Sequence, residues 1–196
     1  MFNKSNLAVS KITKDKGVEF SPEWTMGTDG RILLAVQTMP KDMIQDAPNI
    51  EGKTPMGEYE KFWLDAKVAQ SVFKAIPKSP AIPILENAFV IDNGDGTKSL
   101  KTTDFSSVQS FPINGEKAFV GKWESCFPTK EPVLKIRLNA ELLKTLMGTI
   151  IKALESRYDY PVDFSFYSDT DAVRVDAKNN ATGQEIKGLI MPMHKD

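Results

Sequence analysis

The chain contains very few of the residues on which most catalytic and metal sites depend. Its 196 residues include one cysteine, Cys126, and one histidine, His194. A single cysteine excludes an intramolecular disulfide and fits a reducing compartment. A single histidine, third from the end of the sequence, argues against a Ser-His-Asp triad and against a histidine-based metal site. We therefore expect a protein that is not an enzyme, with no catalytic residue, no metal and no cofactor.

Long hydrophobic runs are also missing from the sequence. No stretch of about 18 apolar residues is available to span a bilayer. Residues 1–9 lack the apolar run of about 7 to 15 residues that characterises a signal peptide. The sequence predicts a cytoplasmic protein with no membrane partner.

Neither sign of charge predominates. The chain has 25 lysine and arginine residues, 26 aspartate and glutamate residues, and a formal net charge of −1. Such a chain has no global basic field with which to bind nucleic acid tightly. Any contact with DNA must come from a local basic face.

Two acidic segments are the remaining candidates for ion binding or acid-base chemistry. Asp92-Asn-Gly-Asp-Gly96 lacks the ligand spacing of an EF-hand, so we expect a hairpin turn there. Asp169 and Asp171 stand between two alternating runs, in the setting of a β-turn rather than of a carboxylate pair.

Residues 1–57 form the first expected segment, an N-terminal block of strands followed by a linker. Apolar patterning predicts strands at 7–12, 17–20 and 31–36. Residues 41–58 contain prolines and glycines but few clustered apolar residues, which indicates a boundary.

Residues 58–130 open with a strand at 60–64 and a helix that Asp65 caps and Pro77 ends. Strands are expected next at 84–91, 98–103, 108–113 and 117–120. The apolar residues of the helix form one stripe: Ala69, Val72, Phe73 and Ile76. Its other side is basic and carries Lys67, Lys74 and, past the helix end, Lys78.

Residues 131–196 repeat this order. We expect a strand at 134–138, Asn139 as N-cap, a helix from Ala140 to about Glu155, and strands at 162–167, 173–177 and 185–191. The core stripe of this helix comprises Leu142, Leu143, Leu146, Met147, Ile150, Ile151 and Leu154. Lys144 and Lys152 lie on its other side, where Gly148 would allow a close approach.

The duplicated order of strand, helix and three strands predicts an α+β fold. We expect residues 58–196 to form one domain of two units, 58–130 and 131–196. Two helices would then lie on one face of a curved antiparallel sheet.

Two short motifs lie near the ends of the chain. Residues 27–40 read Gly-Thr-Asp-Gly-Arg-Ile-Leu-Leu-Ala-Val-Gln-Thr-Met-Pro, and residues 188–196 read Gly-Leu-Ile-Met-Pro-Met-His-Lys-Asp. Methionines adapt to varied apolar side chains, and the turn at residues 29–30 offers polar backbone groups. Thr-Asp-Gly is also a common turn, and Met-Pro-Met also fits the end of an edge strand.

In this order the two motifs resemble the peptide-binding pocket of bacterial sliding clamps, the DNA polymerase III beta subunit family, where an apolar C-terminal tail packs beside a Thr-Asp-Gly-His-Arg-Leu-Ala loop. Arg31 takes the histidine position, and His194 stands where the family usually has arginine. The resemblance also covers these segments: 62–73, 83–87 with 102–104, 121–128, 138–144 and 171–193. A full bacterial subunit is far longer, so the chain resembles either a shortened or divergent relative or a part of such a subunit.

The resemblance implies a DNA-clamp-like fold and a processivity factor. As a homo-oligomeric ring, such a factor encircles duplex DNA without sequence specificity and tethers DNA polymerase or repair proteins through their clamp-binding peptides. The implied pocket residues are Thr28, Gly30, Arg31, Leu33, Ile190, Met191, Pro192 and Met193. The implied DNA-facing residues are Lys67, Lys74, Lys78, Lys144 and Lys152, although lysines on a helix also fit a solvated face. The alternative is a clamp-fold adaptor or regulator that binds clamp-interaction peptides without encircling DNA.

Overall fold

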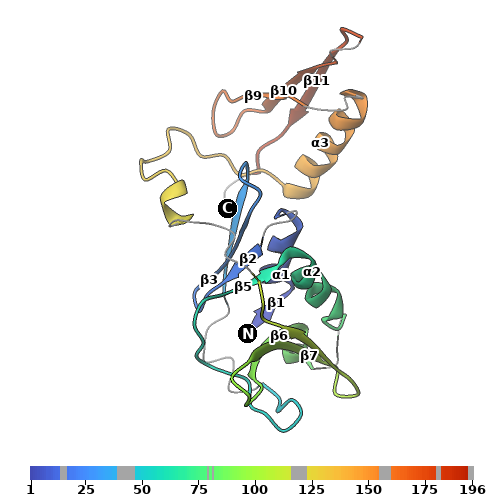
Figure 1. The fold of residues 1–196 in the computed structure, drawn as a ribbon. Helices are drawn as coiled ribbons and strands as arrows, with labels where there is room; N and C mark the ends of the chain where they lie inside the picture. The colour runs from blue at the N-terminus through green and yellow to red at the C-terminus, as the bar shows by residue number, and fades with distance from the viewer. Residues whose placement is uncertain are drawn as a thin grey trace. The chain divides into compact units, whose positions relative to one another are not determined.

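The computed structural model describes residues 1–13, 17–38, 47–78, 80, 82–115, 123–154, 160–179 and 182–193. The chain divides into two compact units, Met1–Cys126 and Phe127–Asp196 (Figure 1). The described residues form three α-helices and three antiparallel sheets, so the chain is an α+β protein. The strand expected at 117–120 and the residue His194 lie outside the described residues.

The first unit contains two copies of one motif, in which a strand and a helix precede three strands. The first copy consists of β1 (Phe2–Asn3), α1 (Lys4–Ala8) with the 3₁₀ helix η1 (Val9–Lys11), β2 (Gly17–Phe20), β3 (Trp24–Thr28) and β4 (Leu33–Gln37). The second consists of β5 (Phe62–Asp65), α2 (Ala66–Ala75), the 3₁₀ helix η3 (Pro83–Glu86), β6 (Asn87–Asp92), β7 (Lys98–Thr103) and β8 (Val108–Pro112). The repeated order expected in the later part of the chain therefore begins already at residue 2.

Each motif of the first unit gives its first strand to the sheet of the other motif. The two sheets have the strand orders β1-β6-β7-β8 and β5-β2-β3-β4. Phe2 of β1 lies opposite Ala88 of β6, and Leu64 of β5 lies opposite Val18 of β2. The two motifs thus exchange their first strands reciprocally, and neither sheet is complete without the other motif.

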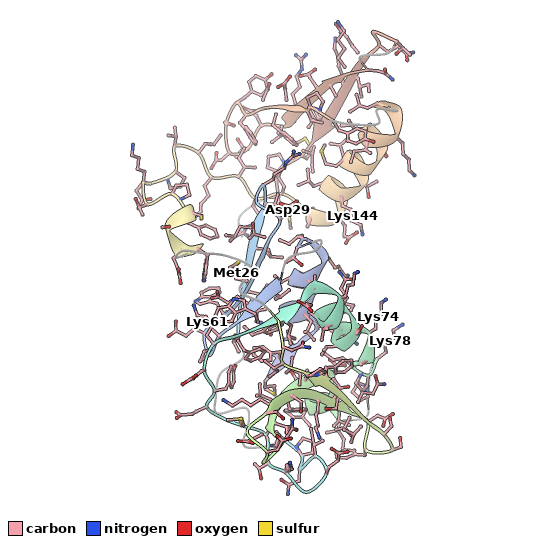
Figure 2. The ribbon with its side chains drawn as sticks, viewed as in Figure 1. Met26, Asp29, Lys61, Lys74, Lys78 and Lys144 are labelled. Carbon is pink, nitrogen blue, oxygen red and sulfur yellow. The ribbon has the colours of Figure 1, made fainter. Side chains whose placement is uncertain are left out.

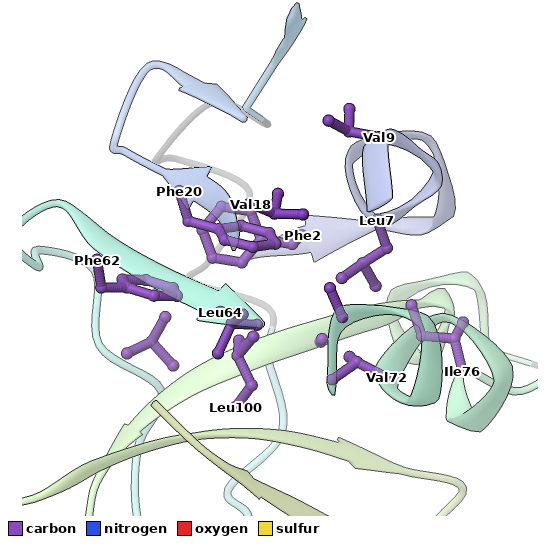
Figure 3. Close-up of a cluster of buried hydrophobic side chains, with 13 residues drawn as sticks. Phe2, Leu7, Val9, Val18, Phe20, Phe62, Leu64, Val72, Ile76 and Leu100 are labelled. Carbon is purple, nitrogen blue, oxygen red and sulfur yellow. The ribbon is translucent and has the colours of Figure 1, made fainter. Parts of the chain in front are cut away.

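Both helices and both sheets of the first unit enclose one hydrophobic core (Figure 3). The rings of Phe2 and Phe20 meet edge to face at 4.8 Å, and those of Phe20 and Phe62 stack at 5.2 Å. The buried members of the core are Phe2, Leu7, Val9, Val18, Phe20, Phe62, Leu64, Ala69, Val72, Ile76, Ala88, Val90 and Leu100. Burial of so much apolar surface fixes α1 beside α2.

The strand expected at 7–12 is wrong, because these residues continue a helix. Asn3 and Asn6 form a capping box: the Asn6 N–H donates to Asn3 Oδ1 at 3.1 Å, and the Asn3 N–H donates to Asn6 Oδ1 at 3.2 Å. The helical path buries both Leu7 and Val9 in the core. Reciprocal capping fixes the first turn and thereby favours the helix over an extended chain.

The second unit contains a third copy of the motif. It comprises residues 134–138, α3 (Ala140–Leu154), β9 (Asp163–Ser165), β10 (Val173–Lys178) and β11 (Glu185–Ile190), with the strand order β9-β10-β11. Residues 134–138, expected to be a strand, belong to no sheet among the described residues. The buried core contains Ile150, Leu154, Val173, Val175 and Ile190.

Of the two N-cap residues expected from the sequence, only one forms capping hydrogen bonds. Asn139 Oδ1 accepts the N–H groups of Glu141 at 2.9 Å and Leu142 at 3.1 Å, which confirms it as the N-cap of α3. Asp65 precedes α2 as expected, but its side chain accepts no capping hydrogen bond. The start of α2 is therefore fixed by packing of its apolar stripe rather than by a cap.

Two features differ from the expected arrangement. The strand β2, from the segment 1–57, pairs with β5, from the segment 58–130, so both lie in one compact unit that ends at Cys126. Instead of one curved sheet carrying two helices, α2 and α3 belong to different units with separate sheets. None of the described helices has the length and apolar character needed to cross a bilayer.

Candidate nucleic-acid and peptide interfaces

The helices of the first unit present a basic surface, which we call the basic helix pair and define as Lys4, Lys11, Lys67, Lys74 and Lys78. The segments α1, η1 and α2 contain no acidic residue. Lys67, Lys74 and Lys78 are exposed, and Figure 2 shows Lys74 and Lys78 at the outer surface of α2. A chain of nearly balanced charge thus has a local group of basic side chains, as contact with phosphate requires.

Burial of the opposite side of α2 determines where its lysines point. Ala69, Val72 and Ile76 are buried in the core, as their spacing predicts. Since residues three and four apart share one helix face, Lys67 and Lys74 must lie on another face. The sequence therefore predicted correctly which side of α2 would be exposed.

The basic helix pair includes two lysines that the sequence did not identify. Lys4 Nζ donates to the Pro77 carbonyl at 2.9 Å, and Lys11 Nζ lies 4.6 Å from the centre of the Phe73 ring. Both contacts join the first helical segment to α2 or the residues that follow it. The two lysines were missed because residues 7–12 resemble a strand; the Asn3-Asn6 capping box was the available signal.

The two lysines proposed on α3 lie on a less basic helix. Lys144 and Lys152 are exposed. Lys144 Nζ lies 3.3 Å from Glu141 Oε2, one turn earlier, and both side chains are mostly exposed. An exposed pair of this kind contributes little to stability, but it offsets the local positive charge.

The turn between β3 and β4 uses its own polar groups. Asp29 Oδ1 accepts the N–H groups of Arg31 at 2.9 Å and Ile32 at 3.0 Å, while Thr28 Oγ1 accepts the Gly30 N–H at 3.0 Å and donates to the Ile32 carbonyl at 2.7 Å. Gly30 has a φ of 94°, which glycine adopts without strain. These N–H groups, expected to anchor a peptide, are already engaged within the turn.

The apolar tail separates into buried and exposed residues. Ile190 is a member of the second unit's core and is 4% exposed. Met191 and Met193 are 58% and 46% exposed, and Pro192 is half-buried. The Met193 N–H donates to the Arg137 carbonyl at 2.8 Å. The methionines can contact a ligand, whereas Ile190 is already packed in the core of its own unit.

The two halves of the expected pocket come from different compact units. Thr28, Gly30, Arg31 and Leu33 belong to the first unit, where Thr28 is buried and Arg31 is exposed. The tail belongs to the second unit. The turn and the tail are therefore described separately, each as a candidate surface of its own unit.

The acidic segments form turns. In residues 92–96 the Gly94 N–H donates to Asp92 Oδ1 at 2.8 Å and the Thr97 N–H donates to Asp95 Oδ1 at 2.9 Å; hydrogen bonds from Thr97 lower the pKa of Asp95. Ser168 Oγ accepts the N–H of Asp171 at 3.0 Å. Within the described ranges, no three His, Cys, Asp or Glu side chains gather as metal ligands would.

No protein-family model and no curated protein matches this chain.

Proposed function

We propose that the chain is a DNA sliding-clamp-like processivity factor. The observation that carries the proposal is the first unit, in which two motifs of the same order place α1 beside α2. Exposed lysines lie on these helical segments, at Lys11, Lys67 and Lys74, and just past α2, at Lys78. A clamp needs a helical layer of this kind toward the phosphates and a sheet layer behind it. Several copies of the chain would assemble into a ring whose helices surround the duplex.

The chemistry of the basic helix pair suits binding without sequence preference. Lysine ammonium groups on flexible side chains contact phosphates as point charges and do not read base edges. Lys67, Lys74 and Lys78 can follow the backbone as the ring slides, because each contact is weak and exchanges readily. Lys144 and Lys152 would add to this surface, Lys144 less than the others because of Glu141.

The peptide-tethering role rests on the tail and the turn. Met191 and Met193 are exposed apolar side chains without a fixed shape, which suits several client peptides. Ile32 and Leu34, which flank the expected pocket residue Leu33, are also more than two-fifths exposed. Each of these two surfaces, taken by itself, would hold apolar residues of a clamp-interaction peptide.

Salt-dependent DNA association tests the role of the basic helix pair. The affinity of the full chain for a fluorescent duplex is measured over a range of salt concentrations, for the unchanged chain and for the triple variant Lys67→Ala, Lys74→Ala, Lys78→Ala. The variant should bind more weakly. Its salt slope, the slope of the logarithm of the binding constant against the logarithm of the salt concentration, should be smaller in magnitude by about 0.9 for each phosphate that is no longer neutralised. A matched triple variant, Lys130→Ala, Lys178→Ala, Lys187→Ala, removes three exposed lysines of the second unit and should bind like the unchanged chain.

Equal binding by both triple variants would contradict the proposal. If the chain also failed to stay on closed circular DNA but still bound a short Gln/Leu/Phe-rich peptide, the adaptor function would replace it. Retention on closed circles and release after linearisation would support encirclement.

A further inference from the structure

The second unit contains one copy of the motif, whereas the first unit contains two. The first unit has two motifs, and each supplies the edge strand of the other's sheet. The second unit has one motif, so in the described residues 134–138 pair with no strand and β9 has a neighbour, β10, on one side only. One motif therefore offers both a strand to donate and a sheet edge to receive one.

A hydrogen bond identifies 134–138 as the equivalent of β5. In the first unit the Gly115 N–H, three residues after β8, donates to the carbonyl of Trp63 at 3.0 Å. In the second unit the Met193 N–H, three residues after β11, donates to the carbonyl of Arg137 at 2.8 Å. Trp63 and Arg137 each stand two residues before the N-cap of their helix.

This bond also shows which edge of residues 134–138 is open. Successive residues of an extended strand direct their backbone groups to opposite edges. Trp63 therefore faces the exit of β8, while its neighbours Phe62 and Leu64 face β2. By the same geometry Arg137 faces the tail, and Ile136 and Leu138 direct their N–H and C=O groups to the edge where a β2-like strand would pair.

We propose that a second copy of this chain completes the second unit by reciprocal strand exchange. Residues 134–138 of each copy pair antiparallel with β9 of the other, as β1 pairs with β6 and β5 with β2 within the first unit. The contact is isologous, since each copy uses the same two elements, and it joins two copies as a symmetric pair. The inference rests on the fold and stands or falls independently of DNA binding.

The first unit also fixes the register. The N-cap residue of each helix lies opposite the first residue of the receiving strand: Asn3 opposite Asn87, and Asp65 opposite Gly17. The same rule places Asn139 opposite Asp163 of the second copy. Leu138 then lies opposite Phe164, Arg137 opposite Ser165, and Ile136 opposite Phe166.

In this register, two exposed phenylalanines occupy positions that are buried in the first unit. Phe164 and Phe166 correspond to the second and fourth residues of the receiving strands, which are Val18 and Phe20 in β2 and Ala88 and Val90 in β6. All four are at most 1% exposed, whereas Phe164 is 39% and Phe166 is 49% exposed. Phe164 lies opposite the buried Val175, so it faces the core side of its own sheet.

The helix α3 is incompletely covered in the same way. Counted from the N-cap, Leu143 and Leu146 occupy the positions of Ala69 and Val72, which are fully buried in α2, yet both leucines are only partly buried. Leu142 and Ile151, expected in the core, are 58% and 44% exposed. A Cβ added to Gly148 would meet no atom within 4 Å, which leaves room for a second helix.

Charge complementarity favours a second copy as the occupant. The donated segment carries Lys135 and Arg137 and no acidic side chain, while β9 carries Asp163 and no basic one. Arg137 opposite Ser165 would be a diagonal neighbour of Asp163 across the two strands. A single sequence therefore supplies both the basic strand and the acidic edge that it fits.

Sedimentation of the full chain without DNA gives the first test. We expect a dimer, twice the 21.8 kDa of one chain. The double variant Phe164→Asp, Phe166→Asp should sediment as a folded monomer, because both side chains are more than one-third exposed in one copy. Phe105→Asp is the matched control: this exposed phenylalanine lies in the turn between β7 and β8, and the variant should remain a dimer.

Cross-linking tests the register. Cys126, which is exposed, is first replaced by serine so that it cannot form adventitious disulfides. Oxidation of the variant Arg137→Cys, Ser165→Cys should then give a disulfide-linked dimer, because directly opposite residues bring their Cβ atoms within about 5.5 Å. The control Ile136→Cys, Ser165→Cys places the two thiols on opposite faces of the sheet and should give none.

Two results would overturn the inference. One is a monomeric unchanged chain at every concentration measured. The other is a dimer that persists in the Phe164→Asp, Phe166→Asp variant and forms no Arg137→Cys, Ser165→Cys cross-link, which would locate the dimer contact on another face. Neither result depends on whether the basic helix pair binds DNA.

Discussion

Gly115 lies against the backbone of Trp63 so closely that a Cβ on this glycine would be 2.5 Å from both the carbonyl carbon and the carbonyl oxygen of Trp63. The Gly115 N–H donates to that same oxygen at 3.0 Å. The segment that leaves β8 is thereby bound to the outer edge of β5. The end of the second motif thus holds the strand with which that motif begins.

Replacing Gly115 with alanine should destabilise the first unit. The new methyl group would meet backbone atoms, which cannot move aside as a flexible side chain can, so we expect a loss of about 1 to 3 kcal/mol in the free energy of unfolding. Urea denaturation, monitored by tryptophan fluorescence, measures this loss of free energy. Gly57→Ala is the control, because nothing lies within 4 Å of its added Cβ; equal stability of the two variants would contradict the close approach.

Removal of the α3 cap should have a measurable cost. Asn139→Ala eliminates two hydrogen bonds to the first turn of α3 and should lower the free energy of unfolding by about 1 kcal/mol. Asp65→Ala, at the same position of α2, removes no capping bond and should cost much less. Thermal or urea denaturation of the two variants compares them, and a larger loss for Asp65→Ala would refute this difference.

The stability of the first unit should fall at alkaline pH because of Tyr59. Burial beside Phe2 and Phe62 raises the pKa of the Tyr59 hydroxyl from 10.0 to about 12. The folded state therefore favours the neutral phenol, a contribution that is fully present below pH 10 and is lost as the pH rises through 12. Absorbance at alkaline pH reports the ionisation, and Tyr59→Phe should weaken the alkaline loss of stability; an identical pH profile for the variant would be evidence against this assignment.

Truncation of two neighbouring tail side chains, Ile190 and Met191, should change the free energy of unfolding by very different amounts. Ile190→Ala opens a cavity in the core of the second unit and should cost about 2 to 5 kcal/mol. Met191→Ala changes an exposed side chain, so its effect on stability should lie within about 0.5 kcal/mol. If the tail holds client peptides, Met191→Ala should still weaken peptide binding, measured by fluorescence anisotropy.

The lysines of α1 and η1 should contribute to DNA association alongside those of α2. Lys4→Ala with Lys11→Ala should lower the affinity for duplex DNA at low salt and reduce the salt slope by about 0.9 for each phosphate that these lysines neutralise. Circular dichroism should show an intact fold, because Lys11 is exposed and Lys4 is only partly buried. An unchanged salt slope would limit the DNA-facing surface to α2.

Local sequence patterns were sufficient to predict a helix where one face of that helix is buried within its own unit. The apolar spacing of residues 69–76 predicted α2, and the cap at Asn139 predicted the start of α3. The same method misplaced residues 7–12, because Leu7 and Val9 alternate as in a strand while the Asn3-Asn6 capping box determines a helix. The strand β3 was not predicted. The sequence indicated the turn that follows β3, but no strand was assigned before that turn.

Pairing over long distances could not be predicted from local patterns. Nothing in the sequence around Phe2 indicates that its partner is Ala88, and the apolar stripe of α3 does not show that Leu142 and Ile151 are left exposed. For the candidate sites, the exposure of Lys67 and Lys74 followed from helix geometry. The internal hydrogen bonds of residues 28–32 did not, because they depend on the exact path of the turn.

The exchange of first strands in the first unit has a consequence for how the chain folds. The sheet begun by β2, β3 and β4 lacks its edge until β5 has been synthesised, and β1 has no partner until β6 follows. Pairings between such distant segments form slowly, because closing the long loops between them costs chain entropy before the contacts are made. We expect residues 1–115 to acquire their structure in one late, cooperative step, with neither motif persisting alone as a stable intermediate.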